Sequence, residues 1–326
     1  MTMNKESVKR NAANAKIKKK VAHIITYIAR LAFLIAISYI VIYPLLYMIV
    51  SSITEESAFL SSRRIWIPDA VTFSFYPLIV EIIDYFKALL STVKFEVVAA
   101  LIEVCSCAVA AYGFSRFNFK LKKLCSAMLF LTILIPTAMI IIPLAVNYAH
   151  LDFFGILGLI NKLTGVDLRL RIINTPWSFW LPSLFGIGLR SGIMIFIYMQ
   201  FFKGLPGEFE EAAYVDGAGP LRTFLQIIIP SSTVVILTVS VFSIIWHWND
   251  YQMSTMFMNQ DLPLSVSLLN LPDHLGLYGY YISDSDPRAI SLMMAACLLF
   301  ILPVLVCYLI VQHWFIESVD RVGITG

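Results

Sequence analysis

Residues 205–220 read LPGEFEEAAYVDGAGP and connect two strongly apolar parts of the chain. Pro206 suits the first position of a helix, and the glutamates that follow favour the positive end of its dipole. Gly217 stands where a helix commonly ends in the left-handed conformation, and Pro220 then blocks its continuation. The segment therefore predicts a short helix over 206–216, about 16 Å long at ~1.5 Å per residue.

One face of this expected helix collects small and acidic side chains. Phe209, Ala212, Ala213 and Asp216 follow the i, i+3, i+4, i+7 spacing that places residues on one face. Alanine at two of these positions allows another backbone to approach closely. The face suits docking into a groove of a partner protein, and a solvated surface helix is the alternative.

The rest of the chain is too apolar for an ordinary soluble enzyme. Of its 326 residues, 59% are hydrophobic and 14% are charged, whereas soluble domains are about half apolar and about a quarter charged. Mean hydropathy is +0.80. A net charge of +3 without a basic aromatic motif gives no case for nucleic-acid binding. The five cysteines all lie in apolar runs, which does not suggest a disulfide framework.

Apolar runs of the length needed to cross a bilayer, ~20 residues, recur along the chain. Because lipid cannot satisfy open backbone groups, each such run must be helical. The sequence therefore predicts an all-α membrane protein with six transmembrane helices, at about 22–50, 90–114, 124–149, 181–202, 224–246 and 289–315. The fourth run is diluted by Gly186, Gly188, Arg190 and Gly192, and Pro136 and Pro143 are expected to kink the third.

Basic residues place both ends of the chain in the cytoplasm, because cytoplasmic loops are enriched in Lys and Arg. Residues 1–21 carry Lys5, Lys9, Arg10, Lys16, Lys18, Lys19 and Lys20, and the loop 115–123 carries Arg116, Lys120, Lys122 and Lys123. The basic stretch and the apolar run behind it are too long for a cleavable signal peptide. We expect a cytoplasmic basic tail at 1–21, a membrane domain at 22–316 and a cytoplasmic tail at 317–326. The outer loops 51–89 and 247–288 are long enough for short helices lying on the membrane.

Several spaced elements resemble one family of transport proteins. Glu211-Ala212-Ala213 is followed by Gly217 after three residues, and by Ile227 and Pro230 further on, as in the EAA loop of ABC-importer permeases. Residues 201–206, FFKGLP, and 248–250, WND, are similar to the carbohydrate-uptake branch. The chain thus resembles the MetI-like, binding-protein-dependent permeases over nearly its whole length from the first apolar run onward.

This resemblance implies a fold, a mechanism and partners. Such a permease is a six-helix core that translocates a sugar or oligosaccharide by alternating access across the bacterial cell membrane, surrounded by lipid. It works with a second homologous permease, two ATPase subunits and an extracytoplasmic sugar-binding protein. The loop at about 203–223 would couple it to the ATPases through Pro206, Glu208, Glu211, Ala212, Ala213, Asp216, Gly217 and Pro230.

The chain itself is not expected to be an enzyme or to bind a cofactor. It contains no G-x-x-x-x-G-K-[ST] phosphate loop with which to cradle nucleotide phosphates. ATP and Mg²⁺ are therefore expected to be used by the partner ATPase subunits.

Candidate substrate-path residues lie at the end of the fifth run and within the second. Trp246, Trp248, Asn249 and Asp250 offer aromatic faces and hydrogen-bonding groups, although Trp also gathers at membrane interfaces and the polar pair could simply hold the helix end. Glu103 lies near the middle of the second run, seven residues after Glu96. An ionisable group there either lines a cavity or is satisfied by another helix. His247 shows no sequence partner, which favours a structural role.

Other function classes fit less of the sequence. An ion-coupled secondary transporter predicts internal repeats and several buried charges, and a membrane enzyme predicts a cluster of reactive side chains. Neither pattern is visible, and both leave 201–230 unexplained. A permease for a non-sugar solute is the nearer alternative, because the EAA loop alone does not fix the substrate.

Overall fold

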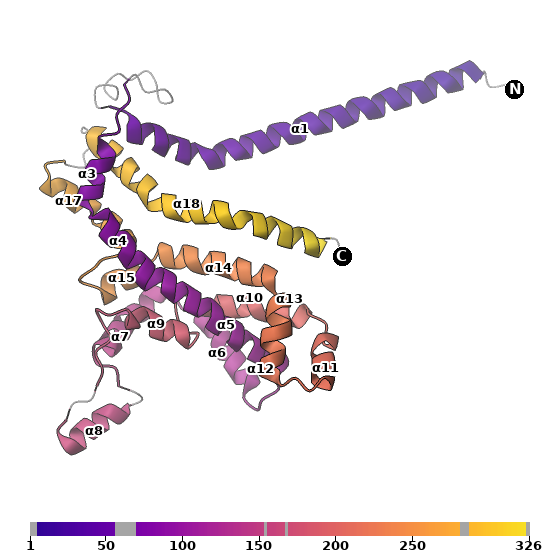
Figure 1. The fold of residues 1–326 in the computed structure, drawn as a ribbon. Coiled ribbons are helices and arrows are strands. Elements are labelled where there is room, and N and C mark those ends of the chain that lie inside the picture. The colour runs from indigo at the N-terminus through magenta and orange to yellow at the C-terminus, as the bar shows by residue number, and fades with distance from the viewer. Residues whose placement is uncertain (1–4, 56–69, 153–154, 167–168, 281–286, 324–326) are drawn as a thin grey trace.

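The computed structural model describes residues 5–55, 70–152, 155–166, 169–280 and 287–323, which form helices joined by loops (Figure 1). Strand-like pairing among these residues is limited to the isolated bridges Thr54–Val71 and Leu151–Leu170. The predicted all-α fold is confirmed for the described part of the chain.

The longer helices are α1 (Lys5–Ile53), α5 (Val98–Arg116), α6 (Lys122–Leu134), α7 (Thr137–Ala149), α10 (Ser191–Gly204), α14 (Thr233–Trp248) and α18 (Pro287–Gly323). The shorter ones are α3 (Phe75–Ile82), α4 (Tyr85–Thr92), α8 (Ile156–Thr164), α9 (Trp177–Leu184), α11 (Glu208–Val215), α12 (Pro220–Thr223), α13 (Ile229–Ser231), α15 (Gln252–Phe257), α16 (Leu264–Leu269) and α17 (Leu271–Leu277). Two π-helical turns, η1 (Val93–Val97) and η3 (Phe224–Ile228), join α4 to α5 and α12 to α13. Short helices thus occur within 51–89 and 247–288, where they were predicted.

Within the described residues, three helices are long and apolar enough to cross a membrane: Lys18–Ile53, Tyr85–Arg116 and Arg288–His313. Two helix pairs also qualify if each bent pair counts as one span. The pair α6 and α7 is bent by 105°, and α12–α13 meets α14 at 82°. The first bend lies at Pro136, whose ring and missing N–H interrupt a helix, so the kink predicted there is confirmed.

The predicted count of six spans is not confirmed, and the fourth predicted span, 181–202, differs most from the structure. α9 ends at Leu184 and α10 begins at Ser191, so the run is split. Between them, Gly186 has φ 67° and Arg190 has φ 60°. Left-handed residues cannot continue a right-handed helix, which gives the physical reason for the break.

The core is built around α5, which packs against α9, α10 and α14. Near one end of α5, the Tyr112 ring lies 4.8 Å from that of Phe224 and 6.2 Å from that of Phe202, centroid to centroid. Tyr198 stacks on Phe202 at 5.6 Å. Aromatic pairs of this kind contribute about 0.5–1.5 kcal/mol each beyond their buried area. They hold α10 and η3 against this end of α5.

The two terminal helices, α1 and α18, contact each other at one edge of the molecule near the end of α1 and the start of α18, and the N-terminal part of α1 extends away from α18 (Figure 1). The most apolar part of α1 buries none of its residues within the chain, as expected for a helix surrounded by lipid or a partner. α1 runs without a break across the predicted boundary between residues 21 and 22. The ends marked N and C lie on the same side of the molecule as α11, whereas α3 and α17 lie on the opposite side.

Candidate functional site

The predicted helix at 206–216 is present as α11, which spans Glu208–Val215 and is therefore slightly shorter than expected. Gly217 has φ 79°, as predicted for a left-handed helix end. The Gly217 N–H donates to the Tyr214 carbonyl at 3.0 Å, and the Ala218 N–H donates to the Ala213 carbonyl at 2.9 Å. These two bonds form a Schellman motif, which satisfies carbonyls left open at the end of the helix. Pro220 then begins α12, also as predicted.

One side of α11 is tied to the end of α5 by an ion pair. Arg116 Nε, in the last turn of α5, lies 3.2 Å from Glu210 Oε2. The same guanidinium donates to the Leu205 carbonyl through Nη2 at 2.9 Å. Both charged side chains are largely buried, with exposed fractions of 17% and 10%. The contact therefore fixes both α11 and the loop before it to α5.

The opposite side of α11 is open. Its exposed residues are Glu208, Phe209, Glu211, Ala212, Tyr214, Val215 and Asp216. Ala213 is buried within the chain, so of the two alanines expected to face a partner only Ala212 is left to do so. Pro206 precedes the helix and is also exposed, while Pro230 lies in α13 near the bend before α14. Residues 208–216 therefore present acidic and apolar side chains around one small residue.

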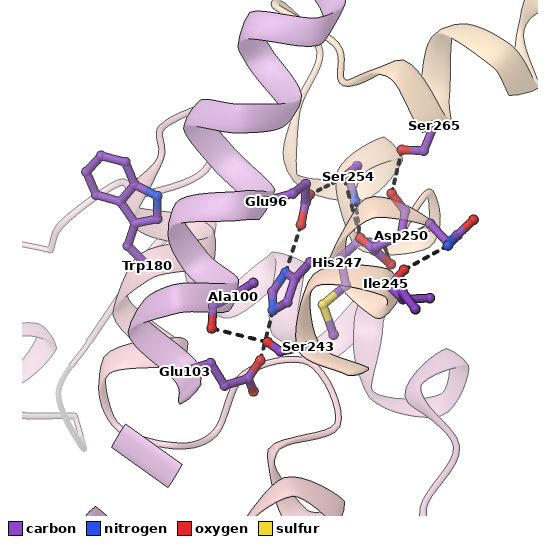
Figure 2. A network of polar contacts seen from close by, with 12 residues as sticks. Glu96, Ala100, Glu103, Trp180, Ser243, Ile245, His247, Asp250, Ser254 and Ser265 are labelled. Carbon is purple, nitrogen blue, oxygen red and sulfur yellow. Dashed lines mark hydrogen bonds and ion pairs between the residues drawn. The ribbon is translucent and has the colours of Figure 1, made fainter. Parts of the chain in front are cut away.

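A second polar assembly lies inside the molecule, between α14 and the continuous helix formed by η1 and α5 (Figure 2). His247 Nδ1 lies 2.9 Å from Glu96 Oε2, and His247 Nε2 lies 2.8 Å from Glu103 Oε2. Their exposed fractions are 3% for His247, 1% for Glu96 and 0% for Glu103. We call these three residues the acid–histidine cluster.

The spacing of the two glutamates explains how one ring contacts both. Seven residues are about two helical turns, or ~10 Å of rise, so Glu96 and Glu103 stand on one face of the same continuous helix. The imidazole of α14 enters between them, with one ring nitrogen directed at each carboxylate. Ionised carboxylates only accept hydrogen bonds, and an imidazolium donates from both nitrogens. The geometry therefore matches a positively charged His247 between two acids.

Hydroxyl groups occupy the remaining carboxylate oxygens of the cluster. Ser254, in α15, donates from Oγ to Glu96 Oε1 at 2.7 Å. Ser191, at the start of α10, donates from Oγ to Glu103 Oε1. Each glutamate thus has a partner on both oxygens, which is the condition under which buried charges are tolerated. The cluster joins α5 and α14 to the first turns of α10 and α15.

The structure distributes the predicted substrate-path residues between the protein interior and two cavities. Trp248 is buried, and its Nε1–H donates to the Phe300 carbonyl of α18 at 3.1 Å. Asn249 donates from Nδ2 to the Ile245 carbonyl at 2.8 Å, which holds the end of α14. The Asp250 carboxylate accepts backbone N–H groups of Met253 at 3.3 Å and Ser254 at 3.1 Å. Asn249 thus contacts the last turn of α14, and Asp250 contacts the first turn of α15.

The larger cavity has a volume of about 690 Å³ and lies between α6–α7 and the break before α10. A neighbouring cavity of about 270 Å³ is lined by Trp246, Asn249 and Asp250, together with Arg190 and Gln252. Glu103 and Trp248 line neither cavity. Of the predicted path residues, Trp246, Asn249 and Asp250 are those brought together around open space.

Two of these contacts were missed by sequence reasoning. His247 was noted without a partner and was not connected to Glu96 or Glu103, although two acids and one histidine in apolar runs must find counter-charges when buried. The ion pair of Arg116 with Glu210 had no sequence signal beyond a basic residue at one helix end and an acid in a nearby loop. Pairing the few ionisable residues of the apolar runs by opposite charge would have found the acid–histidine cluster.

Relatives of the chain are transport permeases. The chain is 29% identical over 210 residues to the sn-glycerol-3-phosphate transport system permease protein UgpE of Pectobacterium atrosepticum, and this match covers 64% of each chain. It thus spans somewhat less than two thirds of the length of that relative. The chain is 25% identical over 293 residues to the inner membrane ABC transporter permease protein YcjP of Escherichia coli, covering 88% of this chain and 92% of YcjP.

A solved structure and a family model agree with this result. A bacterial ABC transporter involved in the import of the acidic polysaccharide alginate matches with a TM-score of 0.68 at 20% identity, covering 90% of this chain and 98% of that chain. This likeness shows a shared fold. Residues 105–321 match the family described as binding-protein-dependent transport system inner membrane component. The chain therefore belongs to the family of binding-protein-dependent transport system inner membrane components, the permeases of ABC importers.

Proposed function

We propose that this chain is one of two permease subunits of a bacterial ATP-driven importer that moves a sugar or oligosaccharide by alternating access. The observation that carries the proposal is α11, an open helix tied to the core through Arg116 and Glu210. A surface helix without a docking role would not need a buried ion pair to fix its position. The family membership does not favour the alternative of an ion-coupled secondary transporter.

In this proposal, α11 and its flanks form the coupling loop at about 203–223. Glu208, Glu211 and Asp216 would meet polar or charged groups in a groove of the ATPase, and Ala212 would allow close approach. Pro206 and Gly217 set the two ends of the helix, and Ala213 packs it against its own chain. Pro230 stands next to the bend of 82° into α14, where movement of the loop would reach the membrane core.

The orientation we propose has both termini and the coupling loop in the cytoplasm. The basic residues in 1–21 and 115–123 support it, as does the position of α11 on the same side of the molecule as the marked ends (Figure 1). In this arrangement 22–316 is the membrane domain, and 1–21 and 317–326 are the cytoplasmic ends. Residues 1–4 and 324–326 lie outside the described part of the chain. The exposed apolar surface of α1 would contact lipid.

The remaining subunits supply what this chain lacks. Two ATPase subunits would use ATP and Mg²⁺ and move the groove in which α11 docks. A second homologous permease would complete the path, and an extracytoplasmic sugar-binding protein would deliver the substrate. Packed interfaces transmit discrete shifts, so α11 would act as a lever between ATP-driven closure and the opening of the path.

The proposed substrate class rests on the relatives and on the cavities. The names of two matched proteins mention glycerol-3-phosphate and the polysaccharide alginate. Trp246, Asn249 and Asp250 border a cavity with both aromatic and hydrogen-bonding groups, which suits a polyhydroxylated solute. Glu103 and Trp248 would support the wall of this path in the present conformation.

A single preparation tests the proposal. The tagged chain is purified in mild detergent, and its ATPase activity is measured with and without candidate sugar-binding proteins. We expect an ATPase and a second permease to co-purify, with turnover raised by a sugar-loaded binding protein. A chain that purifies alone, under conditions that keep a known importer intact, would refute the assembly and the role of α11.

A further inference from the structure

Arg190 is an exposed cation placed where the polypeptide leaves regular helix. It has φ 60° and stands directly before α10, at the break that divides the fourth predicted span. Its side chain lines both the cavity of about 690 Å³ and the neighbouring one of about 270 Å³. Arg190 can therefore contact a solute in either cavity.

No described acid neutralises this guanidinium through an ion pair. Among the described residues that line the larger cavity, Arg190 alone is charged, and the others are apolar, hydroxyl-bearing, amide or glycine residues. The smaller cavity also includes Asp250, whose carboxylate accepts the N–H groups of Met253 and Ser254 and forms no ion pair with Arg190 in the described structure. The wall of the larger cavity is therefore positively charged at Arg190.

Neighbouring groups orient the Arg190 side chain and add hydrogen-bonding groups to the wall of the larger cavity. The guanidinium carbon lies 5.0 Å from the ring centroid of Trp246, a cation–π contact that orients the side chain. Thr132, Thr137 and Gln252 line the larger cavity with hydrogen-bonding groups. Ser191 and Gly192, in the first turn of α10, line the same space, so the start of this helix borders the cavity.

We infer that the cavity between α6–α7 and the α9–α10 break is a subsite for a negatively charged group on the transported carbohydrate, a carboxylate or a phosphate, which Arg190 binds. Planar guanidinium groups bind both anions through two parallel N–H bonds. This inference rests on the proposed function, because it takes a carbohydrate importer as given and assigns its substrate to the acidic class. Trp246 would position Arg190, and the hydroxyl and amide groups would contact the sugar.

The experiment measures binding of small probes to the assembled complex of this chain with its partner subunits, in phosphatidylcholine nanodiscs without a binding protein. Saturation-transfer NMR titrations compare D-glucuronate with D-glucose, and glycerol 3-phosphate with glycerol. Each pair differs in the anionic group, and the two pairs separate carboxylate from phosphate recognition. Arg190→Gln removes the charge, and Arg171→Gln is the matched control, because Arg171 is exposed and lines neither cavity.

We expect at least one anionic probe to bind wild-type complex about tenfold more tightly than its neutral partner, the scale of one charge-assisted contact. Arg190→Gln should remove this preference, and Arg171→Gln should keep it. Arg190→Lys keeps the charge but loses the planar fork, so it should lower the preference severalfold. This variant provides a second measurement if Arg190→Gln does not assemble.

Equal binding of charged and neutral probes by wild type would overturn the inference, as would a preference that survives in Arg190→Gln or is unchanged in Arg190→Lys. Loss of probe binding when phosphatidylglycerol replaces a third of the phosphatidylcholine would also overturn it, because the site would then belong to a lipid headgroup. Failure of the proposed function is seen separately. In that case the partner subunits do not co-purify and no complex reaches the titration.

Discussion

Replacing His247 by leucine tests whether the acid–histidine cluster holds α5 and α14 together. Leucine fills much of the same space but removes both ring nitrogens. Glu96 Oε2 and Glu103 Oε2 then lose partners that lie at 2.9 Å and 2.8 Å. Both carboxylates remain at exposed fractions of 1% and 0%, where water cannot replace the lost contacts.

The size of the effect follows from this burial. Removing one partner of a buried ion pair costs about 3–5 kcal/mol, because an uncompensated charge is left behind. At the ~2 °C per kcal/mol typical of larger domains, the apparent Tm should fall by roughly 6–10 °C. Adding Glu96→Gln and Glu103→Gln to His247→Leu should recover part of this loss, since neither carboxylate is then left unpaired.

The assay is thermal unfolding of the detergent-solubilised complex, followed by the fraction that stays monodisperse on size-exclusion chromatography. His150→Leu is the matched control, because His150 is exposed at the end of α7. A His247→Leu complex that unfolds within about 1 °C of wild type would refute the reasoning. A triple variant no more stable than His247→Leu would show that lost packing, rather than unpaired charge, causes the effect.

Three further predictions address the coupling helix and the α14–α18 contact. Arg116→Gln should leave assembly intact but reduce the stimulation of ATP hydrolysis by a loaded binding protein, because α11 loses its tie to α5; unchanged stimulation in the complex would contradict this. A Cβ added at Gly217 meets no atom within 4 Å, but Gly217→Val places a branched residue at φ 79°, which costs about 1–2 kcal/mol. We therefore expect the variant chain to insert into the membrane normally while substrate uptake falls. Normal uptake would exclude the lever role of α11. Trp248→Phe removes the hydrogen bond from Trp248 to the Phe300 carbonyl, which contributes about 1 kcal/mol. The apparent Tm of the complex should then fall by about 2 °C. An unchanged Tm would show that this bond contributes little to stability.

Features set by neighbouring residues were predictable from the sequence. The helix at α11, its left-handed end at Gly217, the start of α12 at Pro220 and the bend at Pro136 depend on backbone preferences that act within one or two turns. The long apolar runs that became α1 and α18 were predictable for a similar reason, since length and hydropathy are local properties.

Contacts between distant residues were not predictable in the same way. His247 lies 151 residues from Glu96 and 144 from Glu103, so no spacing rule connects them. The weakness of the fourth run was visible in its composition, which Gly186, Gly188, Arg190 and Gly192 dilute, but the place of the break was not. Left-handed conformations at Gly186 and Arg190 break that run, and the one at Arg190 was not predictable, because a non-glycine residue rarely takes a left-handed conformation without tertiary support.

The positions of the two polar contacts on α5 imply how movement of α11 would spread through the permease. Arg116 binds α11 at one end of α5, and Glu103, about 20 Å away along the helix, binds His247 of α14. α14 is also connected to α11 along the polypeptide, because α12, η3 and α13 lie between them in sequence. A shift of α11 therefore reaches α14 by two routes, of which one ends at the acid–histidine cluster. Because that cluster holds α5 and α14 together, we expect the bend of 82° near Ser232 to absorb the difference between the two routes.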